Sequence, residues 1–159
     1  MRFRAQVLGS LFLLGSFLAG ACSPDTAQDA NQGPRREFDQ ARERWDSQGI
    51  DDYRFTLRVG CFCPPEVTDA IVVEVRGGEV VSLEYAAGGP VGHPEYHARH
   101  DTVPELFQLI EMAIQSGADE IRVSYSPAYG FPERTRLDSS TAIADDELSL
   151  MISDFQVLE

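Results

Sequence analysis

The chain has 159 residues, with 26 acidic residues against 13 basic ones and a formal charge of −13 at pH 7. All of the basic residues are arginines, and there are three histidines and three cysteines. So acidic a chain repels nucleic acid and anionic lipid headgroups, and neither is expected as a partner.

Residues 1–21 have the pattern of a secretory signal peptide. Arg2 and Arg4 precede the apolar run VLGSLFLLGSFLAG, which is shorter than the about 20 apolar residues of a membrane-spanning helix. The LAGAC that ends at Cys22 resembles a bacterial lipobox, whose cysteine thiol receives a diacylglyceryl group while the preceding peptide is removed. The sequence Ala19-Gly20-Ala21 also fits ordinary secretion, but that cleavage would leave an odd exported cysteine, so lipidation at Cys22 is favoured.

The polar stretch that follows Cys22 is expected to be a tether over residues 22–35, because it has no apolar periodicity. Ser23 is not the aspartate that would resemble an inner-membrane retention signal, which favours the outer membrane where a cell has one. Removal of the leader takes two of the 13 basic residues and no acids, so 11 against 26 gives a mature charge of −15. The remaining residues, 36–159, are enough for a single domain with one core.

A helix and a strand are the first elements expected in this domain. A helix over residues 36–48 is predicted because three apolar residues recur at helical spacing: Phe38, Ala41 and Trp45. Residues 51–63 then alternate, and the side opposite the apolar one carries Arg54, Thr56 and Arg58. This pattern is typical of a strand with one buried and one wet face.

The next segment, AIVVEVRGGEVVSLEY, has the pattern of a β-hairpin. A two-residue turn at Gly77-Gly78 would pair Ile71 with Glu84 and so mix the two faces. A loop over residues 77–79 keeps apolar pairs throughout: Val75 with Val81, Val73 with Leu83, and Ile71 with Tyr85. We therefore predict the three-residue loop.

A second helix and three further strands are predicted beyond residue 100. Thr102 and Glu105 have the spacing of a capping box, and the apolar stripe after them ends before Gly117. The alternating segments that predict strands begin at Ile121, Thr135 and Leu148, with a turn at SPAYGFP between the first two. The apolar parity changes late in the last strand, which predicts a bulge near Asp154.

The predicted order is therefore α-βββ-α-βββ, and nearly every strand has one polar face. This pattern is typical of an α+β fold with two layers. We expect one antiparallel sheet of about six strands, with two helices on one of its faces and water on the other.

Several blocks of this sequence occur together in a known pattern: Trp45, Ile50-Asp51-Asp52-Tyr53-Arg54-Phe55, Cys61-Phe62-Cys63, Tyr125-Ser126-Pro127-Ala128-Tyr129-Gly130-Phe131-Pro132 and Asp138. Together they resemble a family of secreted bacterial proteins and lipoproteins classed as a domain of unknown function, over about residues 36–155. The resemblance implies export and a shared fold, and it implies no reaction.

Cys61 and Cys63 are the first candidate site. Alternate residues of a strand lie about 6.6 Å apart at Cα, near the upper limit of about 6.8 Å for a disulfide, and Pro64-Pro65 marks the place where the strand should bend. A structural disulfide, two buried thiols and a redox or copper-binding pair are all open, and the first is favoured. We predict bonded sulfurs that are largely buried.

The second candidate is HPEYHARH, which contains His93, His97 and His100. With Glu95 they form a set of ligand types that Zn²⁺ or Cu²⁺ accepts. The surrounding glycines and prolines predict a loop, however, so a solvated loop is favoured over a metal site.

The sequence contains no nucleophile elbow, phosphate-binding loop, HExxH or Rossmann fingerprint, and we assign no catalytic residue and no cofactor. We expect a non-enzymatic lipoprotein of the bacterial cell envelope, anchored to the membrane through Cys22 and facing the periplasm, or the cell exterior in a cell with one membrane. Its partner would be an envelope protein or a glycan. The alternative is periplasmic copper or zinc handling, or thiol redox chemistry, through the cysteine pair or the histidines.

Overall fold

The computed structural model describes residues 26–159, with side chains from residue 32 on. The elements are α1 (Thr26–Asp46), β1 (Tyr53–Gly60), α2 (Pro65–Thr68), β2 (Ile71–Arg76), β3 (Glu79–Tyr85), η1 (Pro94–Tyr96), α3 (Val103–Ser116), β4 (Glu120–Tyr125), β5 (Pro132–Asp138) and β6 (Glu147–Val157). Cys22 and the predicted signal peptide lie outside the described residues. Among the helices of the described part, none is both long and apolar enough to span a membrane.

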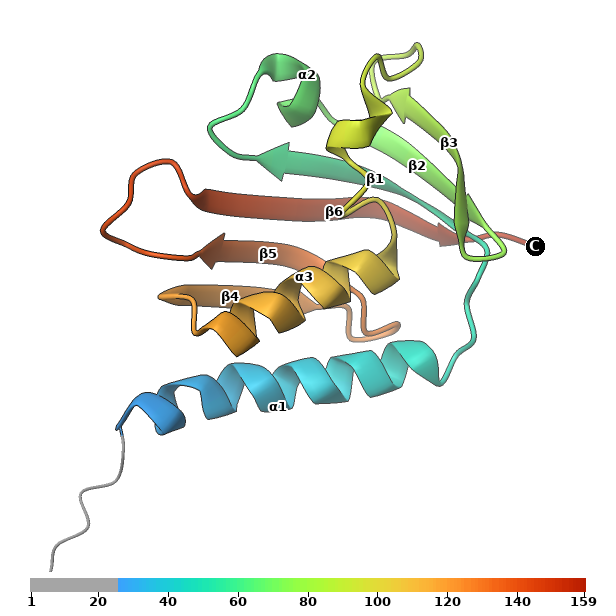
Figure 1. The fold of residues 1–159 in the computed structure, drawn as a ribbon. Helices are drawn as coiled ribbons and strands as arrows, with labels where there is room; N and C mark the ends of the chain where they lie inside the picture. The colour runs from blue at the N-terminus through green and yellow to red at the C-terminus, as the bar shows by residue number, and fades with distance from the viewer. Residues whose placement is uncertain (1–25) are drawn as a thin grey trace, which may run out of the picture.

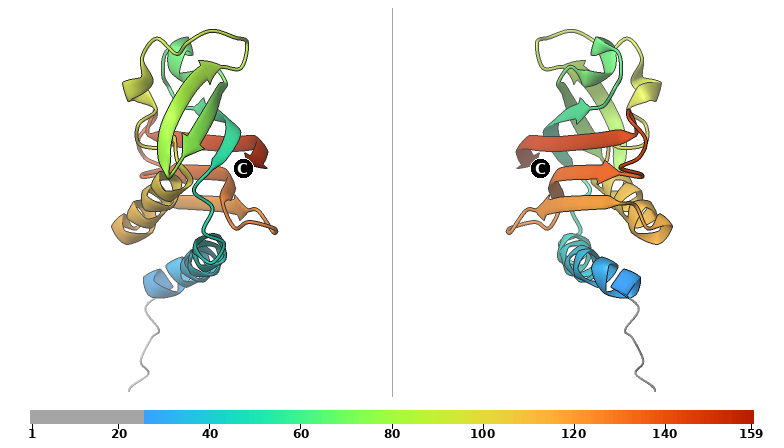
Figure 2. Two further views of the ribbon diagram at one scale, coloured as in Figure 1. Left: turned by 90° about the vertical axis from the view of Figure 1, so that its right-hand side faces the viewer. Right: turned by 90° about the vertical axis from the view of Figure 1, so that its left-hand side faces the viewer.

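The strands form one antiparallel sheet in the order β3-β2-β1-β6-β5-β4. Helices α1 and α3 pack on one face of the β5–β4 end of this sheet, and they leave the other face open (Figure 1, Figure 2). The predicted α+β class and its two layers are confirmed. The short helices α2 and η1 were not predicted, since neither is longer than four residues.

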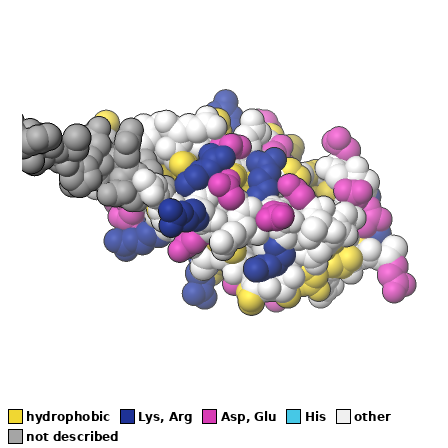
Figure 3. Space-filling view, turned by 90° about the horizontal axis from the view of Figure 1, so that it is seen from below, with side chains coloured by type: hydrophobic (Ala, Val, Ile, Leu, Met, Phe, Trp, Pro, Cys, Tyr) yellow, Lys and Arg dark blue, Asp and Glu magenta, His cyan; other side chains and the backbone are white. Residues whose placement is uncertain are grey.

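Helix α1 begins ten residues before the predicted helix, within the segment expected to be a tether. The polar composition of this segment predicted a tether, but α1 runs through it, including Gly33 and Pro34. Arg35 forms ion pairs with Asp39 one turn later and with Glu111 of α3. Seen from below, the surface of the molecule shows arginines and carboxylates side by side (Figure 3).

Helix α3 has the predicted ends. The Thr102 hydroxyl accepts a hydrogen bond from the Glu105 backbone N–H, and the Glu105 carboxylate accepts one from the Thr102 N–H, so the capping box is complete. Gly117 ends the helix in the left-handed conformation at φ 71°.

The β2–β3 hairpin corrects the predicted loop. The turn is the two-residue Gly77-Gly78, with Arg76 opposite Glu79 and Val75 opposite Val80. A register shift beside Val75 then restores two of the predicted pairs, Val73 with Leu83 and Ile71 with Tyr85. The three-residue loop was therefore wrong, because a tight turn followed by a bulge also keeps the apolar faces together.

Two more details of the sheet agree with the sequence. The pairing of β1 with β6 shifts between Arg54 and Thr56, and Asp154 has φ 53°, so the bulge predicted near Asp154 is confirmed. The segment SPAYGFP is a turn between β4 and β5, closed by a hydrogen bond from the Gly130 N–H to the Ser126 carbonyl.

The core has two parts on the covered face of the sheet. Around α1, Trp45 packs edge to face against Tyr53, Phe131 and Phe155. On the β1–β2 side, the segment between β3 and α3 lies over the sheet (Figure 1), and His97 of this segment is fully buried. This segment therefore covers the strands that the two long helices do not reach.

Candidate functional site

The open face of the sheet gathers arginines on an otherwise acidic protein. Alternation in the strands points six of the 13 basic residues onto this face: Arg54, Arg58, Arg76, Arg122, Arg134 and Arg136. Each of these arginines occupies an outward position of its strand, next to core-facing residues such as Leu57 or Leu137. The same alternation places Glu74, Glu84, Glu120 and Glu147 on this face, so basic residues form a larger share of its charged groups than they do in the chain as a whole, which is strongly acidic.

The strand register arranges four of these arginines into two rows. In the first row, Met151 of β6 lies opposite both Arg58 of β1 and Arg134 of β5. In the second row the order from β1 to β4 is Gly60, Ser149, Arg136 and Arg122. The two rows are adjacent on the open face, since their members alternate along each strand.

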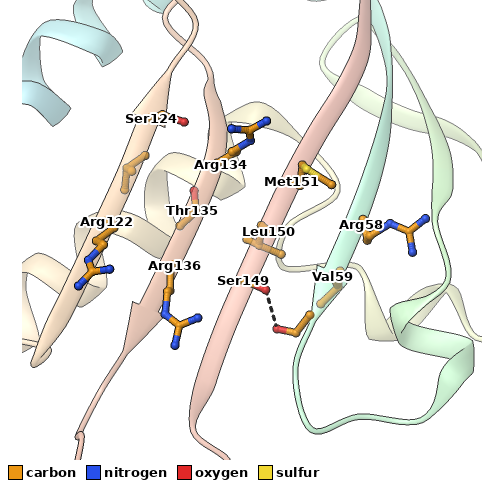
Figure 4. Close-up of a pocket in the computed structure, with 12 residues that line it drawn as sticks. Arg58, Val59, Arg122, Ser124, Arg134, Thr135, Arg136, Ser149, Leu150 and Met151 are labelled. Carbon is orange, nitrogen blue, oxygen red and sulfur yellow. Dashed lines mark hydrogen bonds between the residues drawn. The ribbon is translucent and has the colours of Figure 1, made fainter.

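The rows enclose a shallow groove of about 510 Å³ (Figure 4). Its centre is low because Gly60 has no side chain and Ser149 has a small one, whereas the residues around them are long. The Ser149 hydroxyl donates a hydrogen bond to the Gly60 carbonyl at 3.3 Å. A Cβ at position 60 would collide with that hydroxyl, so only glycine fits there without displacing Ser149.

The charges of the groove are only partly compensated. Glu120 lies at ion-pair distance from Arg122 (3.1 Å) and Arg136 (3.2 Å), and Glu147 lies 2.8 Å from Arg136. The side chains of Arg58 and Arg134 have no hydrogen bond or ion pair to any described residue. Four arginines against two carboxylates leave a local excess of two positive charges.

A second hollow of about 440 Å³ continues the groove toward the end of β1. It shares Gly60, Arg136 and Ser149 with the first and adds the disulfide loop. In this loop Phe62 is 84% exposed, the most exposed large apolar side chain of the described residues. The loop therefore presents an aromatic ring beside the arginines.

Cys61 and Cys63 are bonded to each other, with their Cα atoms 5.2 Å apart. The pairing agrees with the prediction, but the burial does not: Cys61 is only half-buried and Cys63 is exposed. β1 ends at Gly60 and the chain bends toward α2, so the core-facing alternation of the strand stops before it reaches the cysteines. The expectation that both sulfurs are buried was wrong for this reason.

The three histidines are separated by their surroundings. His93 is exposed, lies 3.0 Å from the Glu95 carboxylate and stacks on Tyr96. His97 and His100 are buried, with ring centroids 5.8 Å apart. A solvated loop was therefore the wrong expectation for these two. Within the described residues, no three His, Cys, Asp or Glu side chains are grouped so that they could hold a metal ion.

Burial controls the protonation of His97, His100 and the neighbouring Asp101. It lowers the pKa of His97, opposed in part by the Glu66 carbonyl, although neither ring nitrogen has a described partner in hydrogen-bonding geometry. Burial, and then the charge of His97, lowers the pKa of His100 to about 4. Burial, and then Glu105, raises the pKa of Asp101 to about 7. At pH 5.5, roughly midway between these two values, Asp101 therefore holds a proton while His100 does not.

These two shifts are expected to act on stability in opposite directions. His100 has a pKa of about 4 in the folded protein and the usual value of 6.5 in the unfolded chain. Its contribution to the free energy of unfolding therefore grows as the pH rises from 4 to 6.5. Asp101 has a pKa of about 7 in the folded protein and the usual value of 3.8 in the unfolded chain. Its contribution to the free energy of unfolding is therefore complete at low pH and declines as the pH rises toward 7. Relative to the unmodified protein, Asp101→Asn should therefore gain stability with rising pH, and His100→Gln should lose it.

Urea unfolding at a series of pH values measures both differences. Because each variant is compared with the unmodified chain, the titration of all other carboxylates cancels to a first approximation. If the stability difference between variant and unmodified chain changed with pH in the same direction for both variants, the assignment of opposite protonation states would be contradicted.

The groove was not predicted from the sequence. Arg54, Thr56 and Arg58 were recognised as the wet side of a strand, but the sequence does not show that β1, β6 and β5 are neighbours. The available signal was that arginines occupy the outward positions of several separate strands in an acidic chain.

Comparison with known proteins identifies a family and no relative of known activity. The model of a family described as a family of unknown function, DUF6174, matches residues 37–157. This range contains both the groove and the disulfide loop. No curated protein and no solved structure is significantly similar to the chain.

Proposed function

The chain belongs to the DUF6174 family, whose function is unknown, and we propose that it is an exported, membrane-tethered binding module that holds its ligand on the open face of the sheet. It acts in the cell envelope as a non-enzymatic lipoprotein. The rest of this proposal depends on that face and on the sequence before the domain.

One observation carries the binding role: the groove has two arginine side chains with no partner among the described residues, on a face that none of the described helices covers. Arg58 and Arg134 flank the exposed Met151, and both are themselves exposed to solvent. Charged side chains and an exposed apolar residue gathered in one hollow are typical of a binding site.

The envelope location is supported by the leader and by the cysteines. Residues 1–21 have the signal-peptide pattern and Cys22 lies where a lipobox places its modified cysteine. The Cys61–Cys63 disulfide, with Cys63 exposed, is compatible with an oxidising compartment such as the periplasm. Lipid at Cys22 would hold the groove close to the membrane on its periplasmic side.

The binding role is tested by recovering bound material from an envelope extract of the source cells. The tagged domain is compared with Arg58→Glu/Arg134→Glu, which reverses both unpaired charges, and with Arg99→Glu, which reverses one exposed charge outside the groove. Mass spectrometry of bound lipids, glycans, peptides and small metabolites should find at least one species whose recovery falls about tenfold or more with the double variant alone, as expected for two lost charge-assisted contacts. Equal recovery of every species by all three proteins would reject the proposal.

A second candidate function is metal handling or thiol redox chemistry. The observations that favour it are the exposed Cys63, and the ring nitrogens of the buried His97 and Nε2 of the buried His100, which have no hydrogen-bond partner among the described residues. Calorimetric titration with Cu²⁺ and Zn²⁺, before and after mild reduction, distinguishes this function from the binding module. Heat that disappears in a His97→Gln/His100→Gln variant would favour metal handling.

A further inference from the structure

We propose that the ligand of the groove is a small organic anion with an apolar body, whose charged group pairs with Arg134 while its body lies on Met151. This inference rests on the proposed binding function and narrows it to one ligand class and one orientation. It follows from the size of the groove, from its floor and from the position of its free charges.

The size of the groove suits a small molecule. A volume of about 510 Å³ lies within the range of roughly 300–1,000 Å³ that is usual for small-molecule sites. The groove crosses four strands, β1, β6, β5 and β4, and so spans roughly 15 Å at about 4.8 Å per strand. A ligand with a single short apolar body would fill it.

The floor of the groove favours an apolar body over a neutral sugar. Met151 is 40% exposed and lies between Arg58 and Arg134 in the first row. The neutral hydroxyl groups that line the groove belong to Ser124, Thr135 and Ser149, and Thr135 is buried while Ser149 already donates to the Gly60 carbonyl. The free hydrogen-bonding groups of the groove are therefore mainly cationic guanidinium donors, which favour an anion over a neutral sugar.

The free charge of the groove lies at one side of this floor. The Arg134 side chain has no partner within residues 32–159, and it leans toward β6, where Met151 lies (Figure 4). Arg58 is also unpaired but leans away from β6, and Arg136 is held by Glu120 and Glu147. Arg134 is therefore the guanidinium positioned to bind an anion next to an apolar surface.

The acidity of the whole chain limits the size of the anion. The charge of −13 repels long polyanions, which must approach many carboxylates at once. A small anion on the sheet face meets the local excess of positive charge, four arginines against Glu120 and Glu147, and acids farther away than a Debye length, about 8 Å at physiological ionic strength, are screened. A compact anion thus gains the local attraction with little of the repulsion.

Two fluorescent probes with the same ring system test this assignment. 8-Anilinonaphthalene-1-sulfonate carries a sulfonate, and N-phenyl-1-naphthylamine is its neutral counterpart. Both are titrated at low salt into the whole domain and into Arg134→Gln. Loss of one charge-assisted contact should weaken the sulfonate probe by about tenfold and leave the neutral probe within about twofold of its original affinity.

Two further variants complete the experiment. Arg99→Gln removes an exposed arginine outside the groove and should change neither probe. Met151→Gln keeps a similar volume but makes the floor polar, and it should weaken both probes. Thermal melting confirms that the variants are folded, since exposed substitutions of this kind change stability little.

Three results would overturn the inference: no binding of the sulfonate probe, the same affinity in Arg134→Gln, or an equal loss for the neutral probe. If one of these occurs while the recovery of envelope material still depends on Arg58 and Arg134, the ligand class is wrong and the binding module stands. If the envelope material is also insensitive to those two residues, both proposals fail.

Discussion

Replacing Gly130 with alanine is expected to destabilise the domain by about 3 kcal/mol, which lowers the melting temperature by roughly 10 °C. Gly130 has φ 90°, a conformation in which a Cβ is strained. In addition, that Cβ would collide with the Ala41 carbonyl oxygen and would lie 3.0 Å from the Trp45 nitrogen. Both atoms belong to the backbone of α1, so the clash can be relieved only by moving the helix or the turn.

Gly117→Ala is the matched control for this prediction. Gly117 also has positive φ, 71°, but no atom lies within 4 Å of the position of its Cβ. Its replacement therefore measures conformational strain alone and should cost about 1 kcal/mol. Thermal or urea unfolding compares the two variants. Equal losses would mean that the contact between the β4–β5 turn and α1 contributes nothing to stability.

Replacing Cys22 with serine is expected to move the protein from the membrane fraction to the soluble fraction. If Cys22 carries a diacylglyceryl group, two acyl chains hold the protein, and two chains are enough for stable anchoring whereas one is marginal. The described residues contain no helix that could replace this anchor by spanning the membrane. Fractionation after labelling with radioactive palmitate measures both the lipid and the location.

The double variant Cys61→Ser/Cys63→Ser is the control for loss of cysteine in general, and it should remain labelled and membrane-bound. Ala19-Gly20-Ala21 should still permit cleavage in Cys22→Ser, and the intact mass of the product shows whether residues 1–21 were removed. A cleaved Cys22→Ser protein that is as membrane-bound as the unmodified one would rule out the anchor.

Most of the fold was predictable because its signals are local. The capping box at Thr102, the alternation in β1 and the parity change at Asp154 each depend on residues that are close in sequence. The hairpin register was less certain, because a bulge beside Val75 has no distinct sequence pattern and gives the same apolar pairs as a longer loop.

The candidate site was less predictable because its parts are brought together by long-range pairing. Arg58 and Arg134 are 76 positions apart and meet only because β6 lies between β1 and β5. His97 was expected in solvent because glycines and prolines surround it, but this segment lies over strands that lack a helix. Local composition correctly predicts a loop there and does not show which side chain the loop buries.

The early start of α1 has a mechanical consequence for an anchored protein. Only three residues separate Cys22 from Thr26, and α1 then continues without interruption to Asp46. A helix of 21 residues is about 31 Å long, and Trp45 at its far end is fixed among aromatic rings. A lipid at Cys22 would thus be joined to the core mainly through this helix and not through a long flexible linker. The short distance in sequence between Cys22 and the helix would then limit how far the arginine face can move from the bilayer, and the face would meet ligands in one thin layer of the periplasm.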